Sequence, residues 1–146
     1  MYLDNDLIKI PFTHFKGSNG FRGIDISPDG KYFASFESEH RGVRLWDLQS
    51  FSLLHFFIAP ERFGPVTYIK FSPDGYFLAC LGRFRFWVWD LETKSFAYSF
   101  SGYKSALDKF SFQRASFSYD SKLVASFTYN NFIEIWDIEN NEGSNE

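Results

Sequence analysis

The chain has almost none of the residues that build covalent cross-links or metal centres. Its 146 residues include one cysteine, Cys80, and three histidines. A single cysteine excludes an internal disulfide and a metal site made of several thiolates. His14, His40 and His55 also fall at no spacing that is typical of metal ligands. We therefore expect no metal site and no cofactor.

The sequence also lacks an excess of basic residues and a long apolar run. Its formal net charge is −3 and its isoelectric point is near 5.6. This balance argues against nucleic acid or an anionic membrane surface as the main partner. No run approaches the ~20 apolar residues that span a bilayer. Residues 1–10 carry Asp4 and Asp6 and have no signal-peptide core, so we expect a cytoplasmic protein without a membrane partner.

Aromatic side chains, in contrast, are abundant. The chain contains 20 Phe, 8 Tyr and 4 Trp, which together are 22% of its residues. Aromatic residues suit the half-buried surface of a pleated sheet, and their bulk fills the space between packed sheets. We therefore expect most of these rings to form the core of a protein built from β-sheets.

Three Trp-Asp pairs divide the chain into similar segments. They are Trp46-Asp47, Trp89-Asp90 and Trp136-Asp137, spaced 43 and 47 residues apart. Upstream of the pairs, three ten-residue stretches align without gaps, at 21–30, 66–75 and 112–121. Self-similarity at such a period indicates a repeat architecture.

Each copy carries a tight turn between its first and second strands. The turn reads Ser-Pro-Asp-Gly at 27–30 and 72–75, and Ser-Tyr-Asp-Ser at 118–121. Proline presets φ for a type I turn, and glycine takes the positive φ from which the chain re-enters an antiparallel strand. Ser121 replaces that glycine at a cost on the order of 1 kcal/mol. We therefore expect the third hairpin to be the loosest.

Further strands follow each turn. The second strands are predicted at 32–36, 77–81 and 123–127, the third at 43–47, 86–90 and 133–137, and the fourth at 53–58 and 95–100. Alternate apolar residues of the third strands predict one buried face: Val43 and Leu45, Phe86 and Val88, and Ile133 and Ile135. A small residue recurs in the second strands, at Ala34, Ala79 and Ala125, where it would let neighbours approach closely.

The third copy has no fourth strand, whereas an unpaired strand, Leu7–Phe12, precedes the first copy. Pro11 within it fits an outer edge, where no ladder N–H is needed. The expected organisation is an outer strand at about 7–12, repeats at about 20–58, 65–100 and 111–138, and a polar tail at 139–146. The three repeats together form one domain, 1–138.

These features resemble the WD-repeat β-propeller family, and the resemblance covers roughly residues 7–138. It implies an all-β fold of four-stranded blades that serves as an interaction platform, seldom as a catalyst. Because known propellers use roughly 4–8 blades, three blades would form half of a six-bladed ring. The front strand lies too far from the third copy of its own chain, but two chains arranged head to tail would place it there twice.

The chain departs from the family pattern at several positions. The family places an aspartate six residues before each tryptophan, where this chain has His40, Arg83 and Asn130. Its histidine positions hold Gly17 and Arg62 in the first two copies. No copy therefore has the complete hydrogen-bonded tetrad of the family, and we expect aromatic packing to hold the blades instead.

No catalytic constellation is present. The sequence contains no phosphate-binding loop, nucleophile elbow or Ser/His/Asp ordering, so we expect no enzyme and no catalytic residues. Cys80 aligns with Ser35 and Ser126, which favours a small core residue over a nucleophile. Residues 83–87 alternate basic and aromatic side chains, but a half-exposed strand produces that alternation without nucleic acid.

The turn residues are the best candidates for binding a partner. If the blades stack as expected, these residues gather on one rim: Arg22, Glu39, His40, Arg41, Arg83, Tyr129 and Asn130. Polar loops that carry arginine and tyrosine on a rigid scaffold are suited to recognition. Ordinary solvated turns remain the alternative.

Three functional hypotheses follow. The first is a non-catalytic scaffold that forms a homodimer and presents its rim to a protein or peptide. The second is a fragment or split half of a longer propeller, completed by another polypeptide. The third is a non-catalytic subunit of an enzyme complex, or an enzyme with its site at the ring centre, which no residue set here supports.

Overall fold

The computed structural model describes residues 2–4, 7–9, 21–37, 42–82, 85–101, 112–128 and 133–140. All strand pairs in these ranges are antiparallel. The described residues contain no α-helix, and the 3-10 turn η1 (Glu61–Phe63) is their one helical element. This confirms the all-β prediction.

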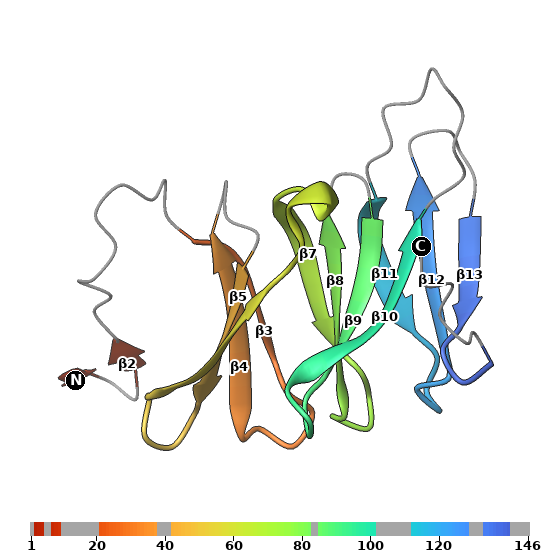
Figure 1. Cartoon of the computed structure of the whole chain (residues 1–146). Helices are drawn as coiled ribbons and strands as arrows, with labels where there is room; N and C mark the ends of the chain where they lie inside the picture. The colour runs from red at the N-terminus through yellow and green to blue at the C-terminus, as the bar shows by residue number, and fades with distance from the viewer. Residues whose placement is uncertain are drawn as a thin grey trace.

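Three sheets follow one another along the chain, and each has its strands in chain order (Figure 1). Blade 1 consists of β3 (Phe21–Ile26), β4 (Tyr32–Glu37), β5 (Gly42–Asp47) and β6 (Leu53–Ile58). Blade 2 consists of β7 (Val66–Phe71), β8 (Phe77–Gly82), β9 (Arg85–Asp90) and β10 (Ser95–Ser101). Blade 3 consists of β11 (Phe112–Phe117), β12 (Leu123–Thr128) and β13 (Ile133–Asp137).

The front of the chain forms a separate two-stranded sheet. β1 (Tyr2–Asp4) pairs with β2 (Leu7–Lys9), with Leu3 opposite Ile8. The predicted front strand is therefore observed over its first three residues, while residues 10–12 lie outside the described ranges. The sequence analysis did not predict β1 as its partner. In the part of the chain that the structure describes, β13 pairs with β12 alone.

The three turns share a network that the sequence analysis did not predict. In the first, the Ser27 hydroxyl donates to Asp29 Oδ1 at 2.7 Å and accepts from the Tyr32 N–H at 2.9 Å. The second and third turns repeat both hydrogen bonds through their own serine and aspartate. The third turn thus keeps the two residues that hold it together, although it lacks proline and glycine.

Positive φ occurs where the turn chemistry predicts it. Gly30 and Gly75 have φ values of 69° and 78°, and Ser121 has a φ of 61°. Ser121 is also buried, and its hydroxyl accepts a 3.0 Å hydrogen bond from the backbone N–H of Asp74 in the neighbouring turn. This bond links blade 2 to blade 3 and opposes the backbone strain of the serine.

The blades pack face to face, always in the same sense. We call the back face of a blade the side on which the next blade packs, and the front face the opposite side. The back faces of blades 1 and 2 consist of Tyr32, Ala34, Phe36, Val43 and Leu45, and of Phe77, Ala79, Leu81, Phe86 and Val88. The first strand of each following blade crosses the first two strands of the blade before it, with β7 on β3 and β4, and β11 on β7 and β8.

Aromatic rings dominate both contacts between blades, as the sequence predicted. Trp89 packs against Phe57 of blade 1, with ring centroids 5.1 Å apart. Trp136 packs against Phe86 and Phe100 of blade 2 at 5.1 and 5.7 Å. The tryptophans of the second and third Trp-Asp pairs therefore contact the preceding blade, and they stabilise the packing between blades.

One polar contact joins blade 1 to blade 2. The Asp25 carboxylate accepts the backbone N–H of Phe71 at 2.8 Å and lies 3.3 Å from the Lys70 ammonium. Since Asp25 and Lys70 are aligned positions of successive copies, the repeat places one charge of each sign at this contact.

Candidate interaction surfaces

The back face of blade 3 is the most exposed apolar surface among the described residues. It carries Leu123, Phe127, Ile133 and Ile135, of which Ile133 is 76% exposed. The aligned residues of the other blades, Val43 and Phe86, are 1% and 0% exposed. The same row of side chains is therefore covered in two blades and open in the third.

This observation corrects one prediction. Ile133 and Ile135 were expected to form a buried face, and they are exposed instead. Alternation along the strand correctly assigned both residues to one face, with Ile135 opposite Ala125. In blades 1 and 2 a following blade buries that face, whereas none follows blade 3 in the described structure.

A recess of about 320 Å³ lies on blade 3, and its lining is mainly apolar. Its lining residues come from blade 3 and, in one case, from β7 of blade 2: Tyr68, Arg114, Ala115, Ser116, Ala125, Ser126, Phe127 and Ile133. Most of them belong to β11 and β12, which correspond to the two strands that the next blade crosses in blades 1 and 2.

The front face of blade 1 is exposed around its edges. Ile24 is 64% exposed, and Ile26, Phe56 and Ile58 are exposed as well. Phe33 and Trp46, nearer the centre of this face, are buried and stack at 5.8 Å. An apolar margin thus surrounds a buried centre.

A buried ion pair distinguishes this front face from that of blade 2. Arg44 donates to Glu37, and its guanidinium lies 4.7 Å from the centre of the Phe56 ring. The aligned residues of blade 2 are Trp87 and Gly82, where an added Cβ would meet the Trp87 ring and the Phe63 carbonyl. The two front faces therefore have different chemistry at the same place.

Of the seven predicted rim residues, Arg22 lies within the described structure. It is exposed on β3, the first strand of blade 1. The other six lie outside the described residues: Glu39, His40, Arg41, Arg83, Tyr129 and Asn130. These six belong to the segments between β4 and β5, β8 and β9, and β12 and β13. The flanking strands end on one side of the stack, at the top of Figure 1.

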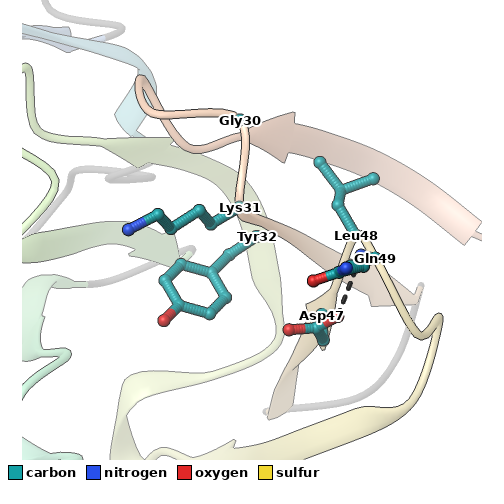
Figure 2. A pocket seen from close by; sticks show the side chains of 6 residues that line it. All are labelled: Gly30, Lys31, Tyr32, Asp47, Leu48 and Gln49. Carbon is teal, nitrogen blue, oxygen red and sulfur yellow. Dashed lines mark hydrogen bonds between the residues drawn. The ribbon is translucent and has the colours of Figure 1, made fainter.

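A second recess, of about 410 Å³, lies between the two hairpin turns at the opposite end of blade 1 (Figure 2). It is lined by Gly30, Lys31, Tyr32, Asp47, Leu48 and Gln49. Asp47 Oδ1 accepts from the Ser50 N–H at 2.7 Å and the Gln49 N–H at 2.9 Å. These bonds, led by that of Ser50, lower the pKa of Asp47. The carboxylate therefore serves the turn, and the recess offers no acid–base pair.

Fragments of the family's hydrogen-bonded tetrad remain. In blade 1 the Trp46 indole donates to the Ser35 hydroxyl at 3.0 Å. In blade 2 Cys80 replaces that serine, and the buried Trp89 Nε1 has no hydrogen-bond partner among the described residues. Burial raises the pKa of the Cys80 thiol well above its ordinary value, so the residue is a protonated core side chain, as predicted.

Other kinds of site are not found in the described ranges. No group of three or more His, Cys, Asp or Glu side chains there is placed to hold a metal ion. None of the described segments forms a helix long and apolar enough to cross a membrane.

Part of the chain is similar to a known family of repeats. Residues 9–47 match the family model described as WD domain, G-beta repeat. The chain carries a WD repeat. The match starts in the predicted front strand and ends at Asp47, the last residue of β5, so it includes β3, β4 and β5 of blade 1 but not β6. No curated protein matches the chain.

The other two blades repeat the construction of the matched one. All three share the Ser-x-Asp turn, the antiparallel order and the Trp-Asp pair at the end of the third strand. A WD repeat on sheets of this kind is typical of protein-interaction scaffolds.

Proposed function

We propose that this chain is a non-catalytic interaction scaffold of the cytoplasm, half of a six-bladed ring that closes when two copies associate head to tail. The back face of blade 3 would then cover the front face of blade 1 in the other copy. The exposed row at Leu123, Phe127, Ile133 and Ile135 carries this proposal, because its counterparts in blades 1 and 2 are blade-to-blade contacts. An apolar face of this kind otherwise favours aggregation.

The front strand supports the same arrangement. In the alignment of the copies, Phe21 corresponds to Val66, so Phe12 corresponds to Phe57 of β6. Phe57 packs on the tryptophan of the next blade, Trp89. A front strand at 7–12 paired with β13 of the other copy would supply the fourth strand of that blade and bring Phe12 to Trp46.

The residue after each Trp-Asp pair gives a further indication. Leu91 and Ile138 occupy this position in blades 2 and 3, and each packs in a cluster shared with the preceding blade. Leu48 is the corresponding residue of blade 1 and is half-buried. In the proposed ring, blade 3 of the other copy would be its preceding blade.

The rim would bind the partner of the scaffold. Loops on a rigid sheet are typical binding sites, and arginine and tyrosine are frequent at the centre of interfaces. The proposed partner-binding residues are those of the predicted rim: Arg22, Glu39, His40, Arg41, Arg83, Tyr129 and Asn130. The proposed partner is a protein or a peptide, because the acidic balance of the chain disfavours nucleic acid.

Light scattering coupled to size-exclusion chromatography tests the association. We expect a species of twice the 17.1 kDa of one chain. Ile135→Asp would bury an unpaired carboxylate in the contact and should give a monomer with an intact β-sheet circular dichroism spectrum. Tyr119→Asp is the matched control, because Tyr119 is 97% exposed and lies on the turn between β11 and β12 rather than within a strand. A folded wild-type monomer at micromolar concentration would refute the proposal.

The second candidate is completion by blades of another polypeptide. The exposed apolar ends favour it as well, since they require a cover but do not by themselves identify one. Under this alternative the chain alone would be monomeric or insoluble, and co-expression with another WD-repeat segment would yield a stable complex of unequal chains.

A further inference from the structure

We propose that the two exposed ends of the stack are matched to each other, with Ile24 and Ile26 of one copy seated against blade 3 of a second copy. This inference rests on the proposed self-association and names the residues that decide which faces pair. It follows from a comparison of the open ends with the two contacts that the chain already makes internally.

The position of the recess on blade 3 indicates what kind of element fills it. In both internal contacts, the first strand of the next blade crosses the first two strands of the preceding blade. Most residues that line the recess belong to β11 and β12, the first two strands of blade 3. Its occupant would therefore be a strand equivalent to β7 or β11, and the remaining strand of that class is β3.

The first matched site pairs residues of the same kind. In the internal contacts the residues at two aligned positions are aromatic and belong to one packed cluster: Tyr32 and Phe71 in the first, Phe77 and Phe117 in the second. The aligned residues at the open ends are Leu123 on blade 3 and Ile26 on β3, and both are aliphatic and exposed. Inside the chain both positions are therefore aromatic, whereas at the open ends both carry smaller side chains of similar size.

The second matched site pairs residues by size. Where the preceding blade has Val43, the next blade supplies Ile69, and where it has Phe86, the next blade supplies Ala115. A large residue thus lies in the same cluster as a small one, as close packing requires. At this position blade 3 has Ile133, which is similar in size to Val43. An isoleucine such as Ile24 therefore fits opposite Ile133 better than an alanine would.

Both sites point to a second copy rather than to an unrelated blade. At each site the exposed residue on blade 3 and the exposed residue on blade 1 match in size, as the aligned residues of the internal contacts do. Two front faces placed against each other would not bring these residues together. The contact is heterologous, so two copies form a closed ring with two identical joints.

Substitutions that exchange the sizes of the side chains at Ile24 and Ile133 test the pairing. Ile24→Ala alone and Ile133→Phe alone should each weaken the dimer, on the order of a hundredfold for the alanine variant. The double variant Ile24→Ala/Ile133→Phe gives the two positions the side chains that Ala115 and Phe86 have at the aligned positions of blades 3 and 2, and should recover most of the lost affinity. Sedimentation equilibrium measures all four proteins, and circular dichroism shows that each is folded.

A mixing experiment tests the direction of the contact without overpacking. Ile24→Asp and Ile133→Asp should each be monomeric, because each spoils both joints of a homodimer. Mixed together, they retain one joint with wild-type residues on both sides, and a heterodimer should form. If front faces paired with each other, or back faces with each other, the mixture would contain no such joint.

The outcomes separate this inference from the proposal on which it rests. A wild-type protein that is monomeric overturns both. A wild-type dimer that is insensitive to Ile24→Ala and Ile133→Phe, or a double variant no better than the worse single one, overturns the residue pairing and leaves self-association standing. A mixture of the two aspartate variants that stays monomeric overturns the head-to-tail direction.

Discussion

Replacing Cys80 by serine is expected to stabilise blade 2, although the position is completely buried. The indole N–H of Trp89 lies near the Cys80 sulfur, but sulfur is a weak acceptor and the two do not reach hydrogen-bond geometry. In blade 1 the aligned Ser35 accepts the indole N–H of Trp46 at 3.0 Å. The substitution would give the buried donor of blade 2 the same kind of acceptor.

The magnitude follows from opposing contributions. An unpaired buried donor costs about 1–3 kcal/mol, and part of this is regained when a hydroxyl accepts its hydrogen. The new hydroxyl must also donate, and Ser126 shows how, because it donates to the Arg114 carbonyl at 2.7 Å. Loss of the larger, less polar sulfur reduces the buried apolar surface and offsets about 1 kcal/mol of this gain. We expect a net gain of about 1 kcal/mol, or roughly 3 °C in melting temperature for a chain of this length.

Thermal and urea unfolding at one fixed protein concentration measure the effect, because association would otherwise shift the midpoint. Cys80→Ala is the matched control, since it leaves the Trp89 N–H unpaired and should lose about 1 kcal/mol. Ser35→Cys is the reciprocal variant and should destabilise blade 1. The reasoning fails if serine at position 80 destabilises the protein as much as alanine does.

Two further predictions concern the turns. Ser121→Ala should lower the free energy of unfolding in urea by about 1–2 kcal/mol, because it keeps the positive φ and removes the acceptor of the Asp74 N–H. Ser121→Gly also removes the acceptor but relieves the backbone strain, so it should be nearly neutral. Stability should also fall in acid: hydrogen bonds, first those from Ser27 and Ser118, hold the pKa values of Asp29 and Asp120 below the ordinary value. The stability that these two carboxylates contribute is complete above their unfolded pKa of about 4, and it is lost as the pH falls through their folded pKa. Melting temperatures should therefore drop below about pH 4. The drop should be smaller in Asp29→Asn, which has one of these carboxylates fewer.

Local chemistry was enough to predict most of the fold. The Ser-Pro-Asp-Gly turns determine where hairpins form, and Gly30 and Ser121 have the positive φ that their positions require. The sequence also predicted that rings join the blades, as Trp89 and Phe57 do. The role of the turn serine and aspartate was missed, although both recur in the third copy, where proline and glycine are lost.

The surfaces were harder to predict. Alternation along a strand assigns Ile133 and Ile135 to one face, but it carries no information on whether another sheet covers that face. The recess beside Ala125 was not foreseen either. The Glu37–Arg44 pair was also missed, because neither residue belongs to a motif and only the pairing of β4 with β5 brings them together. Six of the seven rim residues lie outside the described ranges, so the rim remains a prediction.

The constant sense of stacking gives the assembly a polarity. Since blade 2 packs on blade 1 with its front face and on blade 3 with its back face, copies added in the proposed way would always leave two unlike ends. Copies joined in this way would form either a closed ring, which stops growing, or an open fibre. The small rotation between successive sheets, repeated around the ring, would therefore separate a discrete particle from an open polymer.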